Sequence, residues 1–262
     1  MNAQDFVIEN NVLTAYTGTA SVVTVPDGVT AIGEKAFFMN RDIRHVVLPE
    51  SVTEIGCLAF ANDSHLQGVK LPAGLKKIDT EAFARARILW DIPIPDGVTE
   101  IGTGAFQGCE NLTEISIPES AVECGSWMFS GCVNIQSAGP LGGPYDLTFP
   151  WKGKLPDHAF SGLSGMREIV LPEELKSIPK YAFYDCSALT HIRIPDGVEE
   201  IRDGAFFGCV GLKEIILPAS VKIIYPKAFR YCYDLEKVII PKDTYVCEDA
   251  FKGCRKLEIT NL

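Results

Sequence analysis

The nine cysteines are the residues of this 262-residue chain with the widest chemical range, because a thiolate can act as a nucleophile, a metal ligand or half of a disulfide. No two are spaced as C-x-x-C, the pairing typical of zinc and redox sites. An odd number argues against a complete disulfide framework. Six follow a phenylalanine by three residues: Cys109, Cys132, Cys186, Cys209, Cys232 and Cys254. Cys124 and Cys247 stand where other repeats carry isoleucine, and only Cys57 lies outside an apolar position. We therefore expect buried, reduced thiols that pack as small apolar side chains.

The other groups capable of catalysis are scattered. The four histidines, His45, His65, His158 and His191, form no H-E-x-x-H pattern, and the chain contains no G-x-S-x-G or phosphate-loop motif. The aspartates and glutamates fall at variable positions, as solvated surface residues do. We expect no enzyme activity, no catalytic residue, no metal site and no cofactor.

The elements that carry these residues repeat along the chain. Ten phenylalanines lie mostly 23 residues apart, and most follow a proline by eleven residues: Phe37, Phe60, Phe83, Phe106, Phe129, Phe160, Phe183, Phe206, Phe229 and Phe251. In one repeat, the alternation over 112–117 predicts a half-buried strand that ends at Pro118, and 98–101 predicts a second short strand. Between these strands, 104–109 predicts one short helical turn. A unit this small must stack on its neighbours, so the repeat predicts a strand-rich solenoid.

The repeat interval fixes the expected organisation of the chain. Residues 1–18 predict a β-hairpin about Asn10-Asn11 that covers the first coil, and 19–262 predict about ten repeats within a single structural domain. The interval from Phe129 to Phe160 is eight residues too long, and the excess at 139–148 predicts an inserted loop.

The repeat resembles the BspA-like class of bacterial leucine-rich repeats. Residues 195–217 carry its pattern at every framework position, namely Pro195, Val198, Ile201, Ala205, Phe206, Cys209, Leu212, Ile215 and Leu217. The resemblance covers about residues 20–262. It implies a right-handed leucine-rich-repeat solenoid, with a parallel β ladder on the curved face and short helical turns on the opposite side. It also implies non-catalytic interaction roles, often at a cell surface or in contact with a host.

The net charge of the chain limits the classes of partner that it can bind. A net charge of −10 disfavours nucleic acid and anionic membrane surfaces, which need clustered Lys and Arg. No apolar run is long enough to span a membrane, and no leader is recognisable at the start. We therefore expect a cytoplasmic protein as written, or an extracellular or cell-surface one if a signal peptide has been removed.

Two surfaces are candidates for binding. On the outward side of the repeated strand the candidates are Trp90, Asp91, Glu114, His191, Arg193, Glu214, Ile216 and Ile239. Exposed Trp90 and the pair Ile216 and Ile239 suggest a contact patch, although singly exposed apolar residues are also common. In the inserted loop the candidates are Tyr145, Phe149 and Trp151, and the alternative is a surface bulge whose aromatic residues fold back on the core.

Two functions remain open at this stage. The first is a non-enzymatic binding module that presents its repeat surface to a protein or glycan. The second is a structural protein that assembles with itself through a sheet edge or through the looped middle. We expect a monomer, with self-association as the alternative.

Overall fold

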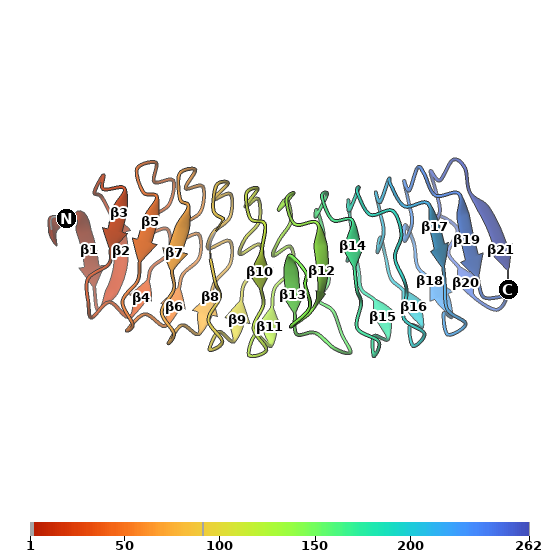
Figure 1. Ribbon diagram of the computed structural model, residues 1–262, viewed down its shortest axis with the longest axis horizontal. Coiled ribbons are helices and arrows are strands. Elements are labelled where there is room, and N and C mark those ends of the chain that lie inside the picture. The colour runs from red at the N-terminus through yellow and green to blue at the C-terminus, as the bar shows by residue number, and fades with distance from the viewer. Residues whose placement is uncertain (1–2, 91, 262) are drawn as a thin grey trace. The chain divides into compact units, whose positions relative to one another are not determined.

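The computed structural model describes residues 3–90 and 92–261, and in this part of the chain short strands stack coil upon coil into a solenoid (Figure 1). Among the described residues the only helix is a single 3-10 turn, η1 (Ala3–Asp5). The chain divides into two compact units between Asn134 and Ile135. The division falls next to the insertion, where the repeat loses its period.

The N-terminal unit, up to Asn134, contains a seven-stranded sheet in the order β1-β2-β4-β6-β8-β9-β11. β1 and β2 form an antiparallel hairpin, whose turn residues Asn10 and Asn11 have φ of 50° and 63°, and the following strands are parallel. The register places each inward residue opposite the equivalent residue of the next coil, as Ile32 lies opposite Ile55. The strands are β1 (Phe6–Glu9), β2 (Val12–Tyr16), β4 (Ala31–Ile32), β6 (Glu54–Ile55), β8 (Lys77–Ile78), β9 (Glu100–Ile101) and β11 (Glu123–Cys124).

A second strand in each coil forms what we call the strand face, the outward surface of the segments that precede the repeat prolines. In the N-terminal unit it contains a parallel sheet of β3 (Val22–Thr24), β5 (His45–Val47) and β7 (Gly68–Lys70), and later β10 (Ile115–Ser116). Between β7 and β10, the described residues 71–90 and 92–114 contribute strands to the seven-stranded sheet and none to this face. Pro93 stands at the position of Val47 and Lys70, and it lacks the N–H that a ladder bond requires.

The C-terminal unit, from Ile135, repeats the same plan. One parallel sheet contains β15 (Ser177–Ile178), β16 (Glu200–Ile201), β18 (Ile223–Ile224) and β20 (Tyr245–Val246). On the strand face, β17 (Glu214–Ile216), β19 (Lys237–Ile240) and β21 (Glu258–Asn261) form a second parallel sheet. β14 (Glu168–Ile169) belongs to another sheet, so the strand-face ladder is interrupted at the coil between β14 and β17.

The insertion folds as part of the ladder. β12 (Ser137–Pro140) pairs in parallel with β13 (Leu147–Phe149) on one side and with β14 on the other. The connection is held by Asp146, whose carboxylate accepts hydrogen bonds from the backbone N–H groups of Gln136 at 2.7 Å and Ser137 at 3.1 Å. The extra residues therefore build one additional strand.

The expected helical turn is a chain of hydrogen-bonded turns instead. Two residues before and two after Phe37 the backbone is left-handed, with φ of 58° at Lys35 and 57° at Met39, and other coils repeat this pattern. An α-helix needs a negative φ at every residue, so none can form. The N–H groups of Lys35, Phe37 and Met39 instead donate to the next coil, at 3.1, 2.8 and 3.0 Å from the oxygens of Cys57, Ala59 and Ala61.

The core of each unit is a column of stacked phenylalanine rings. In the N-terminal unit, Phe60 lies 4.8 Å from Phe37 and 5.1 Å from Phe83, with ring planes within 7°. In the C-terminal unit, Phe206 lies 5.0 Å from Phe183 and 5.1 Å from Phe229. The repeat period is thus one ring per coil, and the stack supplies stability that a single coil lacks.

All nine cysteines are free thiols, as expected. The six that follow a phenylalanine each donate their Sγ–H to the carbonyl oxygen of the preceding coil's phenylalanine, at 3.0 to 3.3 Å. Five of these six are buried, whereas Cys254 is half-buried. Cys124 and Cys247 are also half-buried, so these three are less covered than their positions in the repeat suggested.

Candidate binding groove on the strand face

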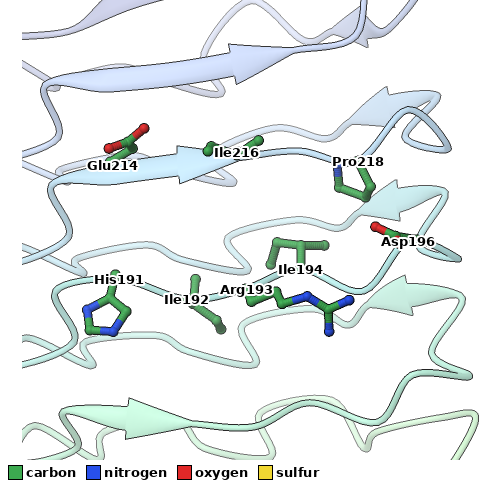
Figure 2. A pocket seen from close by; sticks show the side chains of 8 residues that line it. All are labelled: His191, Ile192, Arg193, Ile194, Asp196, Glu214, Ile216 and Pro218. Atoms are coloured by element: carbon green, nitrogen blue, oxygen red, sulfur yellow. The ribbon is translucent and has the colours of Figure 1, made fainter.

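A groove of about 440 Å³ opens on the strand face of the C-terminal unit (Figure 2). Four of the residues expected on this face, His191, Arg193, Glu214 and Ile216, line it together. Sequence reasoning missed the other four lining residues, which are Ile192, Ile194, Asp196 and Pro218. Ile192 and Ile194 are buried, so they contribute little exposed surface.

The groove lies where the ladder is interrupted. Residues 190–195 take the path of a strand-face segment but form no strand, while β17 beyond them is paired on its far side with β19. In Figure 2, the side chains of Ile216 and Pro218 come from the coil of β17, and those of Arg193 and Asp196 come from the coil before it. The two sides of the groove are therefore formed by two successive coils whose strand-face segments are not paired with each other.

The apolar part of the groove is accessible to a partner. Ile216 is 54% exposed, which is high for an isoleucine in a strand, and Pro218 is half-buried. The next outward residue along the ladder, Ile239, lies directly opposite Ile216 in the pairing of β17 with β19, but it is half-buried. The expected Ile216 and Ile239 pair therefore exists, with Ile216 as its more exposed member.

Two charged side chains of the groove, Arg193 and Glu214, are held by ion pairs. Arg193 pairs with Glu173 of the preceding coil, and this hydrogen bond, with the charges of Glu173 and then Asp196, raises the pKa of Arg193. Glu214 pairs with Lys237 of the following coil at 2.8 Å. Because these pairs are exposed, each adds little stability. They do hold a charge at each end of the apolar surface.

The lining residues suit binding better than catalysis. No serine, threonine or cysteine is among them, and the hydroxyl of Thr190 lies 3.0 Å from Nδ1 of His191. In residues 3–90 and 92–261, no group of three or more His, Cys, Asp or Glu is placed to hold a metal ion. The arrangement offers an apolar surface between charged groups, which is the usual composition of a protein-binding patch.

The candidates on the N-terminal unit are less concentrated. The side chain of Trp90 is 56% exposed, and its backbone N–H donates to the backbone oxygen of Gln67 at 3.1 Å. Asp91 lies outside the described residues, and Glu114 is exposed. The coil that carries Trp90 is the one in which Pro93 interrupts the ladder, so the ladder is interrupted on the strand face of each unit, once at Trp90 and once at the groove.

The inserted segment offers less contact surface than we expected. Phe149 is buried in the core, where its ring lies 5.5 Å from Phe160, so it is withdrawn as a contact residue. Trp151 is half-buried and stacks on Phe149 at 5.2 Å. The ring of Tyr145, also half-buried, lies so close to Gly139 and Gly143 that an added Cβ at either glycine would overlap it. The aromatic residues of the insertion thus fold back on the core.

This architecture defines the class of protein. A solenoid whose coils are short parallel strands around leucine, isoleucine and phenylalanine is typical of leucine-rich-repeat proteins. The model for the BspA type Leucine rich repeat region matches residues 7–136 and 153–262 in six copies, and the chain belongs to this family. The matched ranges leave out the whole insertion at 139–148.

Solved bacterial structures are similar to this chain. A leucine-rich repeat protein from Bacteroides ovatus is 27% identical, with a TM-score of 0.83, and the match covers 100% of this chain and 68% of that one. A leucine-rich repeat protein from Eubacterium ventriosum is 22% identical, with a TM-score of 0.65 and coverage of 96% and 78%. A leucine rich cell surface protein from Faecalibacterium prausnitzii is 23% identical, with a TM-score of 0.47 and coverage of 98% and 92%. No curated protein matches the chain.

Within the described part of the chain, none of the helices has the length and apolar character needed to cross a bilayer.

Proposed function

We propose that the chain is a non-enzymatic binding module, and that the strand-face groove of its C-terminal unit holds a segment of a partner protein. The groove itself carries this proposal, because it combines the exposed Ile216 with fixed charges on both sides. Membership of a repeat family without catalytic residues supports a binding role.

The expected partner segment follows from the lining. An apolar side chain of the partner would pack on Ile216 and Pro218, while its polar neighbours meet Asp196 and Glu214. Fully burying one such aliphatic side chain stabilises a complex by about 1.5–3 kcal/mol, so Ile216 is the residue expected to dominate affinity.

The test is a selection of peptides from a random library on the full chain. We expect selected peptides to lose about tenfold or more in affinity for Ile216→Asp, since that change removes apolar contact and adds a charge. Val22→Asp is the matched control, because Val22 is 53% exposed on β3 of the N-terminal unit. If no peptide is selected, or if the two variants bind the selected peptides equally, the groove is not the binding site.

The same preparations address self-assembly. Light scattering across a range of concentrations should give the mass of one chain, 28.6 kDa, for the wild type. A mass that rises with concentration and falls back in Ile216→Asp would assign the groove to a second copy of this chain and contradict the proposal of a separate partner.

A further inference from the structure

Two arginines and two tyrosines form a cluster on the turn side of the C-terminal unit, which we call the arginine-tyrosine cluster. Cζ of Arg230 lies 4.8 Å from the ring centroid of Tyr231, and Cζ of Arg255 lies 5.0 Å from that of Tyr233. The two rings are 5.9 Å apart, and Nη2 of Arg230 donates to Oη of Tyr231 at 2.9 Å. Both guanidinium groups are therefore held in place by aromatic rings.

Neither of the two cations has a carboxylate partner, which sets them apart from those arginines of the described chain that form ion pairs. Arg193 and Arg202 form ion pairs with Glu173 and Glu200, whereas in the described part of the chain neither Arg230 nor Arg255 forms one. Lys256, which follows Arg255, is already paired with Asp234 at 3.0 Å. Two guanidinium groups thus remain able to take an anion, in a chain whose net charge is −10.

An aromatic row continues from the cluster across the neighbouring coils. Tyr231 lies 5.3 Å from Phe207, which lies 5.1 Å from Tyr184. Tyr184 in turn lies 6.0 Å from Tyr181, which stacks on His158 at 5.0 Å. These rings are half-buried, and Tyr233 is 39% exposed. A surface that repeats from coil to coil suits a ligand that is itself a repeating polymer.

The fold does not require aromatic residues at these positions. The equivalent positions in the N-terminal unit hold Glu81, Arg85 and Gln107, whose coils have the same turn. Tyr181 and Tyr231 also adopt left-handed φ of 51° and 63°, which is unfavourable for a bulky residue. Aromatic residues are therefore present here in spite of a local cost in backbone energy.

We propose that the arginine-tyrosine cluster and the aromatic row bind an acidic polysaccharide. Carboxylate or sulfate groups of the polymer would pair with Arg230 and Arg255, and the apolar faces of its sugar rings would pack on the tyrosines. The tyrosine hydroxyls can hydrogen-bond sugar hydroxyls. This site is separate from the strand-face groove and does not depend on the function proposed for it.

The experiment measures binding of two acidic probes, an oligogalacturonate that carries carboxylates and a heparin oligosaccharide that carries sulfates, to the full chain. Arg230→Ala and Arg255→Ala should each weaken binding about tenfold, because each removes a charge-assisted contact. Arg202→Ala is the control, since that guanidinium is paired with Glu200 at 2.9 Å and should leave affinity unchanged. Arg255 is exposed, so its variant is expected to fold even if Arg230→Ala does not.

Binding measurements with further probes distinguish recognition of the charge from recognition of the sugar backbone. A methyl-esterified oligogalacturonate has the same backbone without the charge, and it should bind at least tenfold more weakly. Whichever of the two acidic probes binds more tightly identifies the anionic group. The proposal is overturned if neither acidic probe binds, if the esterified probe binds as well, or if Arg202→Ala loses as much affinity as the cluster variants. Equal binding of a polyglutamate of matched length would also overturn it, because the site would then recognise anionic charge without a sugar.

Discussion

Asp63 is a buried carboxyl group that should make the protein less stable as the pH rises. It is fully buried, it occupies the repeat position that holds cysteine in later coils, and its Oδ2 atom has no hydrogen-bond partner. Its Oδ1 accepts from the N–H of His65 at 3.3 Å. Burial raises the pKa of Asp63 to about 7, and the nearby charge of Asp42 adds to this, while the backbone hydrogen bonds of His65 and Leu66 oppose it.

The sign of the effect follows from the raised pKa. Between the unfolded value of about 3.9 and about 7, the folded protein holds a proton on Asp63 that the unfolded chain has lost, so stability falls as the pH rises through this window. A difference of about three pKa units corresponds to about 4 kcal/mol, which we take as the upper limit because relaxation around the carboxylate lowers the penalty. Above about pH 7 this contribution no longer changes.

Asp63→Asn tests this reasoning because an amide keeps the acceptor for His65 and cannot ionise. The preceding coil has an asparagine at the same position, Asn40, whose Oδ1 accepts from the N–H groups of Asp42 at 2.9 Å and Ile43 at 3.0 Å. We expect the variant to be more stable than the wild type by about 2–4 kcal/mol at pH 8 and equally stable near pH 4.

The assay is urea unfolding of both proteins at pH 4, 6 and 8. Asp42→Asn serves as the control, since Asp42 is an exposed carboxylate near the same turn and its removal should shift the curves little. If the stability of wild type and Asp63→Asn changes in parallel with pH, Asp63 is not the protonated group and the reasoning is refuted.

The remaining predictions concern the core and its connections. Phe206→Ala should lower the free energy of unfolding by about 3–5 kcal/mol, because its ring is fully buried between two others. Phe251→Ala should cost less, because its ring is half-buried, and equal losses in denaturant melts would contradict the stacking account. Without denaturant, half-buried Cys254 should react with a thiol reagent faster than Cys109, which is fully buried and whose pKa is raised by that burial. Mass spectrometry of the labelled protein would contradict this if both reacted alike. Asp146→Ala should destabilise the C-terminal unit by about 2 kcal/mol, because its carboxylate accepts two backbone hydrogen bonds, and an unchanged melting curve would show that β13 is held by other contacts.

The stacked coils could be predicted from the sequence because one periodic pattern controls them. The spacing from Phe183 to Phe206 and Phe229 sets one ring per coil, and the alternation before each proline decides which side faces outward. The same alternation placed Arg193 and Ile216 on the outward surface.

What the sequence could not show depends on departures from this pattern. Nothing in residues 190–195 signals that they leave the ladder, whereas Pro93 does signal the equivalent interruption in the N-terminal unit. Phe149 looked like a loop residue because its burial depends on β13, which pairs in parallel with β12.

The turn side was missed for a related reason. Assuming a helical turn between the two strands gives no indication that Tyr231 and Tyr233 would meet each other, or that Arg255 of the next coil would lie over Tyr233. The left-handed residues that exclude a helix, such as Tyr231 with φ of 63°, also set the direction in which these side chains lie. A count of aromatic residues per coil would have shown that the tyrosines gather in the later repeats.

The most direct test of the proposed binding module is hydrogen-deuterium exchange of the full chain with and without a peptide selected on it. The account predicts that the bound peptide slows exchange in residues 190–195 and 214–218, where the backbone borders the groove, and leaves the equivalent segment of β3 unchanged. Protection on the turn side, or on β3, with none at 190–195 would contradict the claim that this protein binds its partner through the strand-face groove.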